Sequence, residues 1–182
     1  MSTTATTTAL PTGVWTADPI HSSASFKVKH MGVANFKASF SELDAKVDGD
    51  AGTVYGAVKA ESIDVTQPDF RGHLLSDDFF AVDKHPEVTF KSTSITPADD
   101  GSLTIAGDLT IKGITKSVTA KGEVSEEGVG LDGSRRVALE LTTTLDRRDY
   151  DLNWQAELPG GKQALAWDVV LDVVLELVGQ EA

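Results

Sequence analysis

The chain has 182 residues, of which 40% are hydrophobic and 7% aromatic, a size that suits one folded domain with its own core. It contains no cysteine, which excludes disulfide frameworks, thiolate nucleophiles and cysteine-based metal sites. Asp and Glu number 28 against 16 Lys and Arg, so the formal net charge is −12. A charge of this sign repels phosphate backbones, and nucleic-acid binding is therefore not expected.

The first thirteen residues are rich in Ser, Thr and Ala and offer little apolar surface to bury. They predict a disordered tail over residues 1–13, followed by one domain over 14–182. They also lack the basic start and apolar stretch of a secretory signal. No window approaches the roughly 20 apolar residues that cross a bilayer. We therefore expect a cytoplasmic protein without stable membrane insertion.

The dominant pattern after the tail has a period of two, which is typical of strands with one buried face. Ala24, Phe26, Val28 and His30 share one face, and the same alternation continues through Phe36 and Phe40. The parity then changes before Leu43, which predicts a bulge or a sharp bend. Six further alternating runs follow, at 53–65, 88–95, 103–111, 118–124, 137–145 and 165–177.

Turn-forming sequences separate these runs at 48–52, 97–101, 112–116 and 126–133. Eight strands with short links predict an all-β fold, an extended eight-stranded antiparallel β-barrel whose closure removes exposed edges. Two connections are too long to be hairpins, 66–87 and 146–163, and long loops are where function often lies. The first is expected to hold a short helix that is opened by Ser76 and Asp77.

Four blocks of the chain resemble the YceI-like family of lipocalin-like polyisoprenoid-binding proteins. They are DPIHSSASFKVKHMGV at 18–33, RGHLLSDDFFAVDKHPEVTFKS at 71–92, GDLTIKGITKSVT at 107–119 and LDRRDYDLNW at 145–154. The resemblance implies a barrel with an elongated cavity for an isoprenoid chain, such as a quinone or polyprenyl tail. The sequence departs from many relatives at Lys112, where they have His or Arg, and at Asp151, where they have Gly. Many relatives also carry a secretory leader.

The barrel lumen is expected to bind the apolar chain through inward-facing side chains. Small residues on the same faces, such as Ala24, Ala38 and Gly107, leave room for a channel, although they would equally match large residues in a fully packed core. The predicted lumen residues are Phe26, Val28, His30, Phe36, Phe40, Phe90, Leu109 and Trp167.

The two long connections are expected to form the mouth of that lumen. Arg71 or Arg147 would donate to a polar head group, with Asp149 pairing with an arginine. Alternatively, Phe79 and Phe80 attach the helix to the barrel, and the Arg147–Asp149 pair holds a loop in place. The predicted mouth residues are Arg71, His73, Phe79, Phe80, Arg147, Asp149 and Trp154.

Other chemistry has weaker support in the sequence. Gly128, Gly130 and Gly133 match GxGxxG, but an alternating strand pattern follows them, so a hairpin loop is predicted rather than a dinucleotide site. The four histidines show no compact ligand spacing and no GxSxG motif occurs. Neither a metal nor another cofactor is therefore expected.

These observations favour non-catalytic binding of a polyisoprenoid or an isoprenoid-quinone-like amphiphile, for storage, transport or stress-related handling. One alternative is an enzyme acting on an isoprenoid or an amide, with His73 and Asp149 as acid and base. Another is a stress-linked interaction protein that forms a homodimer. Val170, Val174 and Val178 on the outward parity of the last strand suggest such a homodimer.

Overall fold

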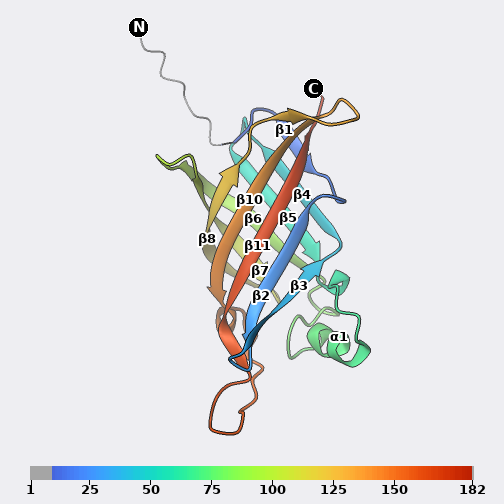
Figure 1. Ribbon diagram of the computed structural model, residues 1–182, viewed down its shortest axis with the longest axis vertical. Helices are drawn as coiled ribbons and strands as arrows, with labels where there is room; N and C mark the ends of the chain where they lie inside the picture. The colour runs from blue at the N-terminus through green and yellow to red at the C-terminus, as the bar shows by residue number, and fades with distance from the viewer. Residues whose placement is uncertain (1–9, 182) are drawn as a thin grey trace.

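The computed structural model describes residues 10–181 and shows one sheet that closes on itself (Figure 1). Pairing of the last strand with its predecessor completes the closure, which confirms the predicted eight-stranded antiparallel barrel. The strands are β1 (Val14–Ala17), β2 (Ser23–His30), β3 (Ala34–Phe40), β4 (Leu43–Asp48), β5 (Thr53–Lys59), β6 (Glu87–Pro97), β7 (Leu103–Ile111), β8 (Ile114–Val124), β9 (Gly128–Val129), β10 (Arg135–Asp146) and β11 (Leu165–Gly179).

Two of the eight barrel positions are each built from two consecutive strands. Both β1 and β2 pair with β11, β1 near its end and β2 over its earlier part. β1 and β2 therefore form one barrel position. β3 and β4 form the next position, because β3 pairs with β2 while β4 pairs with β1 and β5. The break between β3 and β4 at Ser41 and Glu42 agrees with the bend predicted from the parity change, and the Ser41 amide there donates to the Ser62 carbonyl.

The short turns lie where the sequence predicts them. Lys112 and Gly113, with φ of 51° and 75°, join β7 to β8, and positive φ at both central residues is typical of the tight hairpin turn that suits the twist of the strands. The GxGxxG segment forms β9 and the loop before β10, and Val129 pairs antiparallel with Arg135. This confirms the predicted hairpin.

One end of the barrel is closely packed. Trp15, Val47, Ile105 and Leu177 are fully buried at the end that carries the C-terminus (Figure 1). Leu10 joins this core, and the Gly49 amide donates to the Gly13 carbonyl. Residues 10–13 are therefore packed on the barrel, in contrast to the predicted tail, and residues 1–9 lie outside the described residues.

The connection between β5 and β6 contains η1 (Ala60–Ser62) and α1 (Pro68–Leu75), so a short helix lies in the predicted connection. Its start differs from the prediction, because Ser76 follows the helix rather than opening it. Gln67 caps the first turn by accepting a hydrogen bond from the Phe70 amide, and Pro68 occupies the first helical position. Within residues 10–181, no helix is long and apolar enough to cross a membrane.

Candidate functional site

The half of the barrel away from the termini is hollow. A cavity of about 390 Å³ lies there, and a smaller one of about 130 Å³ lies further toward the packed end. Phe26, Phe40, Val88 and Leu171 line both, so these side chains lie between the two cavities. The larger cavity is lined by Phe26, Val28, His30, Phe36, Phe40, Phe70, His73, Leu74, Phe79, Phe80, Val88, Ile111, Leu145, Arg147, Leu152, Trp154, Leu165, Val169 and Leu171.

Glycines on β7 and β8 explain why the middle of the lumen is partly filled. A Cβ on Gly107 would collide with the Phe90 ring, and one on Gly122 would lie 2.6 Å from Leu141 Cδ2. Large side chains therefore enter the lumen at these two positions. The small residues make room for neighbours there, as the packed-core alternative expected, while the larger cavity stays open further along.

Seven of the eight predicted lumen residues line a cavity. Five line the larger one, and Phe90 and Leu109 line the smaller one. Trp167 lines neither, because the register between β11 and β2 shifts between Leu165 and Val169. Its ring lies instead under the Arg147 guanidinium, 4.2 Å from centroid to Cζ. The alternation in the sequence hides this irregularity.

Of the predicted mouth residues, five line the larger cavity: His73, Phe79, Phe80, Arg147 and Trp154. Three of these rings form a cluster, with centroids 5.0 Å apart for His73 and Phe79 and 5.2 Å apart for His73 and Trp154. His73 Nε2 lies 2.9 Å from Asp78 Oδ2, which orients the imidazole. The α1 connection and the 146–163 connection therefore meet at the cavity.

The other two predicted mouth residues lie elsewhere. Arg71 donates from Nη2 to the Glu61 carbonyl, so it fastens α1 to η1 and does not line the cavity. Asp149 is exposed and does not pair with Arg147, because the 3₁₀ turn η2 (Arg147–Tyr150) directs the two side chains differently. The expected Arg147–Asp149 pair is therefore absent from the described structure.

Arg147 is instead held by backbone carbonyls. Its Nε donates to Ala166 at 2.8 Å, its Nη1 to Leu152 and Trp154, and its Nη2 to Leu165 at 3.2 Å. The residue is only 2% exposed. Burial lowers the pKa of this guanidinium to about 10, since the charged form is poorly solvated there. Arg147 thus joins the connection after β10 to the start of β11.

Sequence reasoning missed two cavity residues of α1, Phe70 and Leu74. They are four residues apart and lie on one helical face, and Phe70 contacts Phe36 with ring centroids 5.3 Å apart. The Gln67-Pro68 helix start would have revealed this face. Leu152 and Leu165 also line the cavity, but only the path of their connection brings them there.

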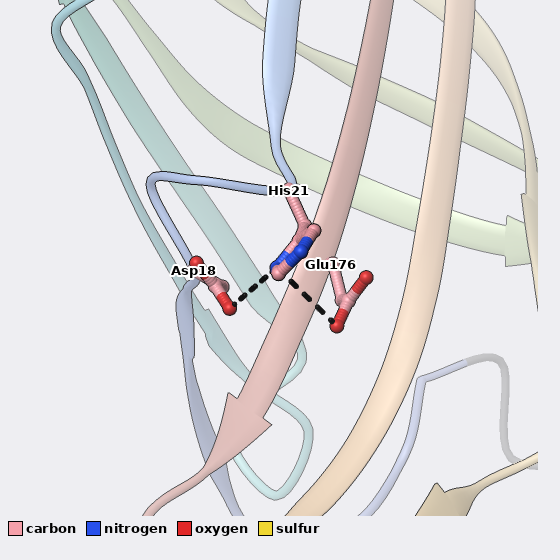
Figure 2. A group of neighbouring side chains, drawn as sticks. All are labelled: Asp18, His21 and Glu176. Atoms are coloured by element: carbon pink, nitrogen blue, oxygen red, sulfur yellow. Dashed lines mark hydrogen bonds and ion pairs between the residues drawn. The ribbon is translucent and has the colours of Figure 1, made fainter. Parts of the chain in front are cut away.

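A second group of titratable residues lies on the outer side of the barrel, near the end of β11 (Figure 2). His21 Nδ1 lies 3.0 Å from Asp18 Oδ2 and 4.0 Å from Glu176 Oε1. These ligand types can hold a metal ion. However, Arg136 Nη1 already donates to Asp18 at 2.8 Å and to Glu176 at 2.7 Å.

Hydrogen bonds from His21 and Arg136 hold the pKa of the Asp18 carboxyl well below its usual range, and the same carboxylate raises the pKa of His21. The group therefore acts as an ion-pair network that ties the segment between β1 and β2 to β10 and β11.

Comparison with known proteins agrees with this geometry. The family model described as the YceI-like domain matches residues 15–177, from β1 to β11. The chain belongs to the YceI-like family. Among relatives of this YceI-like chain, a UPF0312 protein of Staphylococcus aureus strain N315 is 34% identical over 171 residues, which cover 89% of this chain and 95% of the relative.

Solved structures of other proteins share the barrel. Burkholderia cenocepacia BcnA has a TM-score of 0.74 at 22% identity, over 90% of this YceI-like chain and 99% of BcnA. The Campylobacter jejuni YceI protein has a TM-score of 0.70 at 25% identity, over 85% and 91% of the two chains. A polyisoprenoid binding domain from Saccharophagus degradans, implicated in plant cell wall breakdown, has a TM-score of 0.69 at 14% identity, over 91% and 98%.

Proposed function

We propose that this protein binds, without catalysis, a polyisoprenoid or a similar long-chain amphiphile in its barrel lumen. The observation that carries the proposal is the apolar cavity of about 390 Å³ in the half of the barrel away from the termini. Its volume falls within the usual range of ligand sites. Membership of the YceI-like family and the likeness to a polyisoprenoid binding domain support the same ligand class. Reversible binding of this kind would serve storage, transport or stress-related handling.

The cavity volumes indicate how much of a chain the lumen encloses. An apolar protein cavity of about 150 Å³ holds one benzene molecule. By that measure, cavities of about 390 and 130 Å³ enclose on the order of 15 to 20 carbons, or three to four isoprene units. A longer tail would extend beyond the lumen as described.

Apolar burial alone supplies enough free energy for useful affinity. Covering on the order of 400 Å² of a guest's apolar surface is worth about 10 kcal/mol before association costs are subtracted. No covalent step is required for such binding. The acid–base pair of the enzyme alternative is also separated, since His73 lines the cavity while Asp149 is exposed and lines neither cavity.

The first experiment is organic extraction of gently purified protein followed by mass spectrometry. We expect a stoichiometric long-chain lipid. Phe36→Arg places a charge in the apolar lumen and should weaken binding by at least ~100-fold. Asn35→Arg is the matched control, because Asn35 is the neighbour of Phe36 on β3 and its side chain is exposed. This variant should leave the lipid content unchanged.

Circular dichroism of both variants shows whether the barrel has folded. If Phe36→Arg does not fold, titration of the wild-type chain with a fifteen-carbon isoprenoid alcohol decides the question. Folded wild-type protein that carries no lipid after purification and takes up none in titration would contradict the proposal.

A further inference from the structure

The turn at 31–33, between β2 and β3, exposes apolar side chains to solvent. Met31 is 46% exposed and Val33 is 80% exposed. Met31 also has a φ of 52°, in the left-handed region that costs a residue with a Cβ free energy. Neither side chain belongs to a buried core cluster of the described structure. Packing of the fold therefore does not account for these two residues.

This turn lies at the end of the barrel away from both termini, where the larger cavity reaches the surface (Figure 1). His30, which precedes the turn, lines that cavity and is exposed. The Met31 amide donates to the Ala164 carbonyl at 2.6 Å, next to the cavity residue Leu165. Phe70 of α1 also lines the cavity, yet it is 39% exposed. Apolar groups at the surface therefore adjoin the opening of the lumen.

The strands on either side of the turn are basic, although the whole chain is acidic. Residues 19–41 contain three lysines and no Asp or Glu, in a chain with a formal net charge of −12. Lys27 pairs with Asp172 at 3.6 Å. Lys29 and Lys37 are exposed, and no ion pair joins either of them to an acidic residue among residues 10–181. Their charges are therefore available to an anionic surface.

We propose that the 31–33 turn docks reversibly on an anionic phospholipid bilayer, so that the open end of the lumen faces the lipid. Met31 and Val33 enter the interfacial region, and Lys29 and Lys37 lie close to the lipid phosphates. Acidic residues elsewhere on the chain oppose the approach, but salt screens charges that are more than about 10 Å away. This inference goes beyond the proposed function, since docking needs no guest in the lumen.

The size and charge of the turn favour a bilayer over a protein partner. Stable protein interfaces bury roughly 1,000 Å² or more, and the tip of one hairpin offers too little surface for that. A symmetric contact between two copies through this turn would also bring lysines of like charge together. A lipid interface accepts a small apolar tip and gains from the neighbouring lysines.

The test is co-sedimentation of the full-length chain with vesicles of equal parts phosphatidylcholine and phosphatidylglycerol. Val33→Asp should weaken vesicle binding by at least ~10-fold, because its carboxylate would enter the interface. Val129→Asp is the matched control: Val129 is 77% exposed, and its strand β9 pairs with the start of β10, near the packed end. This control should bind like the wild-type chain. Circular dichroism shows whether both variants fold.

A second matched pair tests the lysines separately from the apolar tip. Lys29→Glu should weaken binding to the same vesicles by about 10-fold or more. Lys46→Glu makes the same charge change at an exposed position of β4, next to the packed end, and should have a smaller effect. Wild-type binding to pure phosphatidylcholine vesicles should be about 10-fold weaker than to the mixed vesicles.

The outcomes separate docking from lumen binding. Wild-type chain that does not sediment with the mixed vesicles, or equal binding by Val33→Asp and Val129→Asp, would overturn the docking site. Light scattering that shows a wild-type dimer and a monomeric Val33→Asp variant would assign the turn to a second copy instead. A fifteen-carbon isoprenoid alcohol, titrated without vesicles, should bind Val33→Asp as tightly as wild type. Its failure to bind wild type would contradict the proposed function and leave the vesicle result standing.

Discussion

Lys112 and Asp151, the two positions at which the family resemblance implies other residues in many relatives, are brought together by the structure. Lys112 Nζ donates to the Asp151 carbonyl at 3.0 Å and lies 3.7 Å from its carboxylate. Both residues have left-handed backbone conformations, with φ of 51° and 56°. Because glycine adopts this conformation without strain, the backbone at position 151 would suit a glycine.

This geometry predicts the relative stability of two variants at one position. Asp151→Gly and Asp151→Ala both remove the carboxylate, so they differ mainly in the left-handed backbone that they must adopt. We expect Asp151→Gly to be more stable than Asp151→Ala by about 1 kcal/mol, measured by urea unfolding. Equal stability of the two variants would show that the backbone at this position is not strained.

At the scale of elements, residues 65–85 are attached to the barrel in an unusual way. Their hydrogen bonds and ion pairs in the described structure stay within the connection, such as those from Phe80 to Leu74 and from Lys84 to Asp77. A hydrogen bond to a strand lies just before this segment, where the Asp64 amide donates to the Ser39 carbonyl of β3. The segment itself packs on the barrel through aromatic rings, including Phe80 on Phe40 at 5.7 Å.

We therefore expect this segment to open locally before the barrel unfolds, because opening breaks apolar contacts but no hydrogen bonds to strands. In hydrogen exchange by mass spectrometry, amides of 65–85 should exchange at least ~10-fold faster than those of β10 and β11. Phe80→Ala should accelerate this exchange further, whereas Asp83→Ala, at an exposed position, should not. Exchange of the segment at the same rate as the strands would contradict the prediction.

At the scale of the whole molecule, the barrel combines a packed half with a hollow half. Two leucines of β11 allow a matched comparison: Leu177 is fully buried in the packed core, while Leu171 lines both cavities. Leu177→Ala should destabilise the fold by about 2–5 kcal/mol, because it creates a new cavity in a packed core. Leu171→Ala should cost clearly less, about 1 kcal/mol, since its side chain already borders open space.

Urea unfolding of both variants provides the measurement, with circular dichroism as the probe. Equal costs at the two positions would mean that the hollow half is as tightly packed as the other.

The homodimer stays a prediction at this scale. The outward valines of β11 alternate with polar neighbours, since Val170 pairs in register with Lys27 and Val174 with Glu140. The cytoplasmic location also stays a prediction.

The architecture and the family could both be predicted from the amino-acid sequence. Alternation with a period of two, turn residues at fixed places and the parity change before Leu43 are local signals, so they survive without knowledge of the fold. The same alternation identified the inward phenylalanines of β2 and β3. Short-range pattern and chain order were sufficient for these conclusions.

The open part of the lumen and the polar groups that reach it depend on contacts between distant segments of the chain. The register shift in β11 moved Trp167 out of the lumen, and the turn η2 separated Asp149 from Arg147. The four carbonyls around Arg147 come from residues up to 19 positions away along the chain. Such contacts depend on how distant segments pack, and no local pattern in the sequence encodes them.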